Sequence, residues 1–193
     1  MWRACLGLIL SLSTLVGTPA PAMADESAAW AALRRGAHVA LMRHADAPGG
    51  AGDPPGFRLD DCNTQRNLSA TGREDAKAVG ERLRTEGVAV TKLLSSPWCR
   101  CVDTARLLDM GPPEVEPTFS NAFVLADRRP VLTAGARALV TRWSGPGTLL
   151  VVTHGANIQA LTGVNLDSGE LVVVEPGPNA TLRPVGRIPV PRR

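Results

Sequence analysis

The chain has 193 residues, of which 44% are hydrophobic and 20% are charged. This is the composition of an ordinary globular protein, and it excludes a wholly disordered chain. The formal net charge is only +3, aromatic residues make up 4% of the chain, and there is no tyrosine. We therefore expect no nucleic-acid partner, because neither a strong positive charge nor a set of stacking side chains is present.

The first 24 residues have the pattern of an export signal. Arg3 is followed by an apolar stretch at 6–16, and Ala22-Met23-Ala24 has the small-residue pattern of a cleavage site. We expect a signal peptide at 1–24 and one domain at 25–193; an uncleaved anchor is the alternative. Because no later stretch holds the roughly 18 apolar residues of a membrane span, we expect no stable membrane insertion after cleavage. The mature protein should be periplasmic or secreted.

Short apolar runs alternate with amphipathic segments along the rest of the chain. Strands are predicted at 37–42, 90–95, 148–153 and 171–175, the last pairing with 180–185 as a hairpin. Helices are predicted at 27–35, 71–87, 97–109, 131–143 and from 157. This alternation predicts a three-layer α/β/α fold with a mostly parallel central sheet. The basic segment 187–193 is expected to be a poorly ordered end.

Basic and histidine side chains follow three of the predicted strands. Arg43 and His44 end the first strand, Arg100 follows the second, and His154 follows the strand at 148–153. Ligands of open α/β sheets bind beyond the carboxyl ends of the strands. Two guanidinium groups suit a phosphate dianion, one imidazole can attack phosphorus, and a second, protonated imidazole can stabilise the transition-state charge. This chemistry requires no metal or cofactor.

Each of these residues has a simpler explanation when it is taken alone. A histidine at a strand end is usually a hydrogen-bonded structural residue, and Arg100 alone would be a surface arginine in a salt bridge. His38 lies inside the first strand, and we assign it no role. Only the combination of the four side chains indicates a functional site.

Four short motifs carry a resemblance to a known family. They are Leu41-Met42-Arg43-His44-Ala45, Leu68-Ser69-Ala70-Thr71-Gly72, Ser96-Pro97 with Arg100 and Thr104-Ala105, and Val152-Thr153-His154-Gly155 with Asn157. In this order they resemble the histidine phosphatase superfamily, whose fold is phosphoglycerate mutase-like. The resemblance implies a metal-independent phosphomonoesterase in which His44 becomes phosphohistidine and Arg43, Arg100 and His154 complete the phosphate pocket. Ala45 replaces the usual glycine, a modest departure.

The resemblance leaves the proton donor to the leaving group open. Members of the family use an Asp or Glu from the segment between the second arginine and the second histidine, or one directly after that histidine, where this chain has Gly155. The candidates here are Asp46, Asp127 and Glu170. Asn67, next to the second motif, is a candidate substrate-binding residue.

The resemblance is greatest to the exported bacterial branch, which includes a lipopolysaccharide-core heptose phosphatase. It implies a small-molecule phosphomonoester or an envelope glycolipid phosphate as the partner, and an envelope sugar phosphate as the substrate. The alternative is a phosphate or phosphosugar sensor that has lost turnover. A third hypothesis, phosphotransfer between proteins, is disfavoured by export. The oligomeric state stays open.

Three cysteines lie beyond the predicted signal: Cys62, Cys99 and Cys101. Disulfides persist in exported proteins. Cys99 and Cys101 point to different sides of a helix, so only one of them can face Cys62. We favour Cys62–Cys101 over Cys62–Cys99; either bridge would tie the long loop at 43–66 to the helix that carries Arg100. A metal site is less expected, because no histidine lies at ligand spacing.

Overall fold

The computed structural model describes residues 26–191. The predicted signal peptide at 1–24 lies outside these residues. Six strands form one sheet in the order β3-β2-β4-β1-β5-β6. The strands are β1 (Val39–Arg43), β2 (Val90–Ser95), β3 (Glu114–Val115), β4 (Thr148–Thr153), β5 (Leu171–Pro176) and β6 (Leu182–Ile188). The first four pair in parallel, and β5 and β6 pair antiparallel, as the predicted mostly parallel sheet requires.

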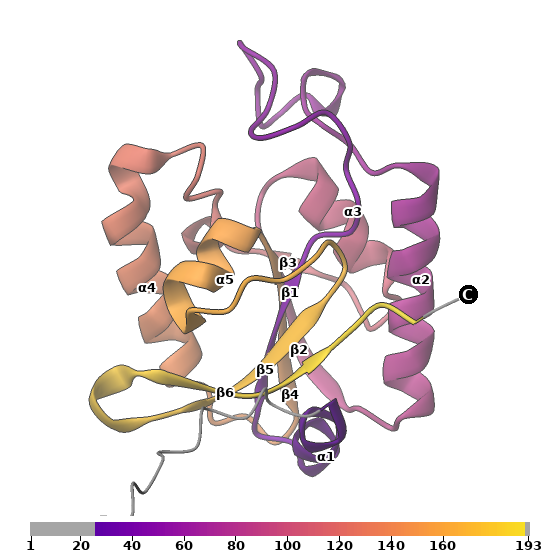
Figure 1. The fold of residues 1–193 in the computed structure, drawn as a ribbon, viewed down its shortest axis with the longest axis vertical. Coiled ribbons are helices and arrows are strands. Elements are labelled where there is room, and N and C mark those ends of the chain that lie inside the picture. The colour runs from indigo at the N-terminus through magenta and orange to yellow at the C-terminus, as the bar shows by residue number, and fades with distance from the viewer. Residues whose placement is uncertain (1–25, 192–193) are drawn as a thin grey trace, which may run out of the picture.

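Helices cover both faces of the sheet, which makes the fold three-layered (Figure 1). On one side lie α1 (Glu26–Arg35), α2 (Ala70–Thr85) and α3 (Cys99–Leu107), and on the other lie α4 (Arg129–Thr141) and α5 (Gly155–Thr162). Short 3-10 turns occur at Cys62–Thr64, Pro117–Phe119, Ala126–Arg128 and Pro178–Ala180. None of the helices within residues 26–191 has the length and apolar character to cross a membrane.

The alternating side chains of the strands explain why two cores form. Along β1, Ala40 and Met42 join the core under α1, α2 and α3, whereas Val39 and Leu41 join the core under α4 and α5. All six residues of β4 are buried. Strands that are covered on both faces become continuous apolar runs, and this made β4 predictable from the sequence to the residue. The bounds predicted for β2 are also confirmed, although only its last three residues are buried.

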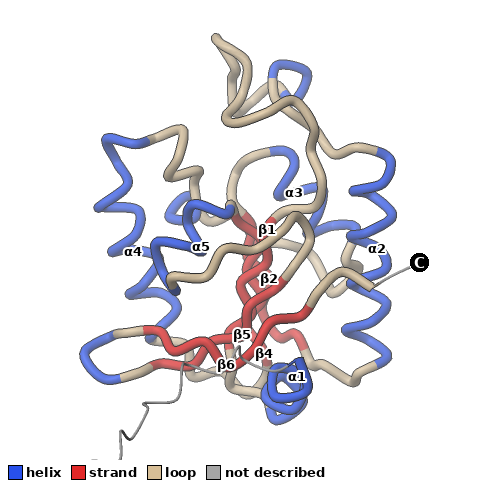
Figure 2. Tube along the Cα trace, in the orientation of Figure 1, coloured by secondary structure: helices blue, strands red, loops and turns tan. Residues whose placement is uncertain are grey.

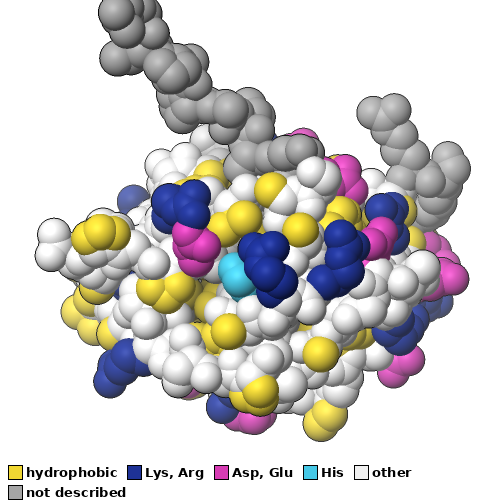
Figure 3. All heavy atoms as spheres, turned by 90° about the horizontal axis from the view of Figure 1, so that it is seen from below, with side chains coloured by type: hydrophobic (Ala, Val, Ile, Leu, Met, Phe, Trp, Pro, Cys, Tyr) yellow, Lys and Arg dark blue, Asp and Glu magenta, His cyan; other side chains and the backbone are white. Residues whose placement is uncertain are grey.

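Loops gather at the carboxyl ends of the parallel strands. Figure 2 shows the long segment between β1 and α2 rising above this edge of the sheet. Figure 3 shows the opposite end of the molecule. Where described residues form that surface, basic side chains lie among acidic and apolar ones, so it carries no continuous patch of one charge.

The prediction of a poorly ordered end from residue 187 is wrong in its first part. Arg187 and Ile188 belong to β6, and the Ile188 side chain is buried in the core under α1. The hairpin prediction for this part of the chain is confirmed, because β5 and β6 pair from Leu171–Ile188 to Pro176–Leu182. The basic and proline-rich composition concealed the apolar residues that anchor the strand.

Candidate active site

The carboxyl ends of the neighbouring parallel strands β1, β4 and β2 lie at the same edge of the sheet. Arg43 of β1 is paired with Thr153 of β4, and the next residue, His44, donates its backbone N–H to the Thr153 carbonyl at 2.9 Å. The rings of His44 and His154 therefore lie side by side, with centroids 5.4 Å apart. Ser96 directly follows β2, and its Oγ is 2.8 Å from His154 Nε2. The two histidines predicted to converge are brought together by the sheet register.

Hydrogen bonds at both nitrogens define the tautomer of His44. Nδ1 lies 2.8 Å from the Ala45 carbonyl oxygen, which can only accept, so Nδ1 carries the proton. Nε2 accepts a hydrogen bond from Arg100 Nε at 3.3 Å. Burial, aided by the charges of Arg100 and Arg43, lowers the pKa of His44 to about 3, although the Ala45 bond acts in the opposite direction. His44 is therefore a neutral imidazole with a lone pair on Nε2.

His154 is buried beneath the same pocket. Its ring packs edge-on against Trp98, with centroids 5.3 Å apart. Burial lowers the pKa of His154 well below its ordinary value, and the neighbouring His44 and Arg100 lower it further. From the sequence we expect a protonated His154, whereas this environment favours the neutral ring; a bound phosphate dianion would act in the opposite direction.

Arginines surround the two imidazoles. Arg43 Nη1 donates to the Leu166 carbonyl at 2.8 Å, and Arg100 has 1% of its side chain exposed. Arg66 and Arg187 also line the pocket; the sequence analysis missed both. The Nε of Arg66 is buried without a hydrogen-bond partner among the described residues. Burial and the charges of Arg100 and Arg43 lower the pKa of Arg66.

These side chains line a cavity of about 610 Å³, a size typical of small-molecule sites. Its rim includes Phe123, of which 53% is exposed, together with Asn165 and Asp167, and the buried Asn121 also lines it. Among the lining residues, the only carboxyl group is that of Asp167. Within the part of the chain that is described, no three His, Cys, Asp or Glu side chains are grouped so as to hold a metal ion.

The three carboxyl groups predicted as proton donors do not line this cavity. Asp46 accepts a hydrogen bond from Ser69 Oγ at 2.7 Å, at the start of α2. Asp127 is exposed in the 3-10 turn before α4. Glu170 is bound to Arg187 Nη2 at 2.5 Å. Local hydrogen bonds engage Asp46 and Glu170 outside the cavity lining, although Asp46 is close to His44 in the sequence.

Asn67 is also outside the cavity lining. Its amide donates to the Cys62 carbonyl at 2.7 Å and to the Gln65 carbonyl at 3.3 Å. In the structure, the Asn67 amide nitrogen thus binds carbonyls of the loop between β1 and α2, and a contact with the substrate stays a prediction.

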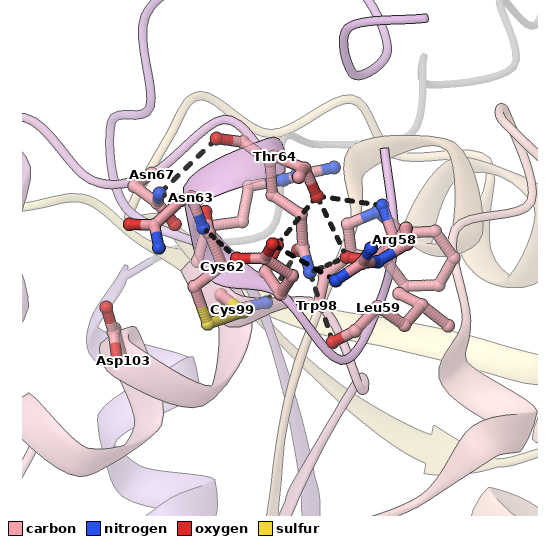
Figure 4. The surroundings of a disulfide bond; sticks show 12 residues. Arg58, Leu59, Cys62, Asn63, Thr64, Asn67, Trp98, Cys99 and Asp103 are labelled. Atoms are coloured by element: carbon pink, nitrogen blue, oxygen red, sulfur yellow. Dashed lines mark hydrogen bonds and ion pairs between the residues drawn. A yellow bond between two sulfur atoms is a disulfide. The ribbon is translucent and has the colours of Figure 1, made fainter. Parts of the chain in front are cut away.

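The disulfide joins Cys62 to Cys99, so the preference for Cys101 is wrong. Figure 4 shows the bridge between this loop and the first residue of α3. Cys101 is a buried free thiol with its Sγ 3.6 Å from His154 Nε2, and burial raises its pKa to about 12. The two cysteines do point to different sides of the helix, as expected, but the side that faces the core is that of Cys101.

Comparison with known proteins agrees with this geometry. The family model described as histidine phosphatase superfamily (branch 1) matches residues 39–122, which include Arg43, His44 and Arg100. Residues 39–122 therefore match the histidine phosphatase superfamily. The family predicted from the four motifs is thus confirmed. His154 lies beyond the matched segment, and the sheet register places it in the site. No curated protein matches the chain.

Several solved structures share the fold of this chain. The protein histidine phosphatase SixA complexed with tungstate is 20% identical, with a TM-score of 0.56 over 78% of this chain and 96% of that one. A putative alpha-ribazole-5'-P phosphatase from Escherichia coli is 16% identical, with a TM-score of 0.55 over 76% of this chain and 93% of that one. A mycobacterial glucosyl-3-phosphoglycerate phosphatase is 18% identical, with a TM-score of 0.52 over 71% and 89%.

Proposed function

We propose that the chain hydrolyses phosphomonoesters through a phosphohistidine formed on His44. The observation that carries this proposal is the neutral His44 ring, held by the Ala45 carbonyl at Nδ1 and facing Arg100 with Nε2. Nε2 attacks phosphorus, the bond from phosphorus to the leaving oxygen breaks, and water then hydrolyses the phosphohistidine. Splitting one difficult displacement into two is the advantage of nucleophilic catalysis.

The charges of the pocket suit a single phosphate group. Arg43, Arg66 and Arg100 surround His44, and each of their charges acts to lower its pKa. Guanidinium groups in a buried site bind phosphate oxygens and stabilise the charge that spreads over them in the transition state. His154 adds a ring nitrogen beside the same oxygens, oriented by Ser96.

The leaving oxygen of an alcohol needs a proton, and we assign its donation to Asp167. The segment that carries Asp167 is attached to the nucleophile's own strand, because Gly169 donates its N–H to the carbonyls of Arg43 and His44 at 3.1 and 3.2 Å. The Arg43 side chain holds the carbonyl of Leu166, the preceding residue. In the second step the Asp167 carboxylate takes a proton from the attacking water.

We further propose an extracytoplasmic substrate, with an envelope sugar phosphate as the first choice. Two features support this proposal: the Cys62–Cys99 disulfide, which persists outside the cytosol, and the export pattern at 1–24. The cavity volume suits a sugar phosphate, and the exposed Phe123 offers an apolar surface to one face of a ring.

The test is turnover of p-nitrophenyl phosphate and of a panel of sugar phosphates, nucleotides and inositol phosphates by the purified protein. We expect release of nitrophenol, and His44→Ala should lower kcat by at least about 10⁴-fold because the covalent route is lost. Wild-type turnover by His44→Ala would refute the nucleophile. The absence of nitrophenol release by the wild type between about pH 4 and pH 8 would favour the alternative, a phosphosugar sensor.

A further inference from the structure

Asp53 lies at the centre of a buried hydrogen-bond cluster that none of the sequence motifs contains. It belongs to the loop between β1 and α2, and its side chain is 0% exposed. Its carboxylate accepts from Arg100 Nη1 at 2.7 Å, Arg100 Nη2 at 3.1 Å, Trp98 Nε1 at 2.9 Å and the Arg66 backbone N–H at 3.1 Å. The loop thus contacts the phosphate-binding arginine from the side away from the nucleophile.

The planar guanidinium of Arg100 is held at both ends. Its two terminal nitrogens bind the two oxygens of Asp53, while its Nε donates to His44 Nε2 at 3.3 Å. A guanidinium group is rigid, so fixing the terminal edge also fixes the direction of Nε–H. A phosphoryl group arriving at His44 Nε2 would present an oxygen to that N–H.

Asp53 also changes the charge of the pocket. Burial acts to raise its pKa, but the hydrogen bonds and charge of Arg100 outweigh this effect and hold the pKa below its ordinary value. An ionised carboxylate next to Arg100 neutralises part of the attraction that the arginine exerts on a phosphate dianion.

We propose that Asp53 is a positioning residue that directs Arg100 Nε toward the phosphoryl group and limits the affinity of the pocket for inorganic phosphate, the product. This inference rests on the proposed phosphatase function. Strong binding of the product would slow turnover. A negative charge that weakens phosphate binding but keeps the orientation of Arg100 therefore favours both phosphoryl transfer and the release of phosphate.

The test compares Asp53→Asn with Asp60→Asn. Asp60 lies in the same loop, but its side chain is 83% exposed and forms its ion pair with Arg58. We expect Asp53→Asn to lower kcat on p-nitrophenyl phosphate by about 10²-fold, because small displacements in an active site have effects of this size. We expect it to tighten the Kd of inorganic phosphate by about tenfold, because a repelling charge is removed. Asp60→Asn should change neither value.

A purely structural role for Asp53 would weaken phosphate binding together with kcat, so an unchanged or larger Kd for phosphate overturns the proposal. In an Arg100→Gln background, Asp53→Asn should change kcat by less than about twofold, because its effect acts through the arginine; a loss as large as in the wild type also overturns it. If Asp53→Asn does not fold, Asp53→Glu keeps the charge and displaces it, and wild-type kcat in that variant would exclude an aiming role.

The phosphate Kd is measured calorimetrically, without turnover. Failure of the wild type to hydrolyse any phosphomonoester would therefore refute the proposed function. The Kd of phosphate could still be compared between Asp53→Asn and the wild type.

Discussion

The inner wall of the pocket and its rim are built from different kinds of structure. His44 and His154 follow paired strands of the central sheet, and Arg100 lies in the first turn of α3; all three are buried. Phe123, Asn165 and Asp167 are exposed and come from loops. Regular hydrogen bonding therefore fixes the groups that we propose act on phosphorus, whereas loops present the groups at the mouth of the cavity.

The sharpest test of this comparison replaces one arginine of the inner wall and one arginine of the rim. Arg100 has 1% of its side chain exposed and Arg187 has 32%. We expect Arg100→Ala to lower kcat/KM by on the order of 10²–10³-fold, because a desolvated charge partner of the transition state is lost.

Arg187→Ala should lower kcat/KM by less than about tenfold, since its charge is partly solvated and paired with Glu170. The two variants are compared with the same substrate and buffer. Equal losses would show that the rim takes part in phosphate binding as strongly as the inner wall does.

The loop between β1 and α2 tests the comparison through stability. The Cys62–Cys99 bridge spans 37 residues, and removing such a bridge should destabilise the protein by about 2–4 kcal/mol. Cys62→Ser together with Cys99→Ser should therefore lower Tm. Dithiothreitol supplies the control, because it should lower the Tm of the wild type to that of the double variant and leave the double variant unchanged. Identical Tm values before reduction would contradict the bridge.

The proposed role of the rim residue Asp167 as proton donor should depend on the leaving group of the substrate. We expect Asp167→Asn to lower kcat on an alkyl phosphate such as β-glycerophosphate by about 10²-fold, because general acid catalysis is lost. Nitrophenolate leaves without a proton. On p-nitrophenyl phosphate, the rate of the first turnover, measured as the initial burst of nitrophenol, should therefore fall by less than about threefold. Asp127→Asn, an exposed aspartate outside the cavity, is the matched control. Equal losses on both substrates would mean that Asp167 does not donate the proton.

The inner wall should also make the free energy of unfolding depend on pH. The pKa of His44 is about 3 in the folded chain and 6.5 in the unfolded chain, so the unfolded chain binds the extra proton between these values. Stability from His44 is complete above about pH 6.5 and is lost as the pH falls, by about 1.4 kcal/mol per pH unit.

Urea unfolding between about pH 4 and pH 7 measures this slope. His44→Ala should reduce it by about 1.4 kcal/mol per pH unit. An unaltered slope in His44→Ala would show that the histidine is not held neutral by burial.

The sequence predicted the inner wall much better than the rim, for physical reasons. Apolar strands covered on both faces have a local signature, and His44 and His154 follow directly from where those strands end. Asp53 and Arg100 are 47 residues apart, and their contact depends on the path of a loop with no repeating pattern. Asp167 was overlooked because its place follows from the backbone bonds of nearby Gly169 to Arg43 and His44 rather than from a motif.

The buried Cys101 thiol has a consequence for how the chain acquires its bridge. Residues 26–191 contain three cysteines, so one pair can be chosen in three ways, and only Cys62–Cys99 fits the folded structure. Exchange between a thiol and a bridge requires a thiolate, and the pKa of about 12 keeps Cys101 protonated once it is buried. Mispairing is thus a hazard of the unfolded chain alone, and an oxidant that acts before folding would trap it.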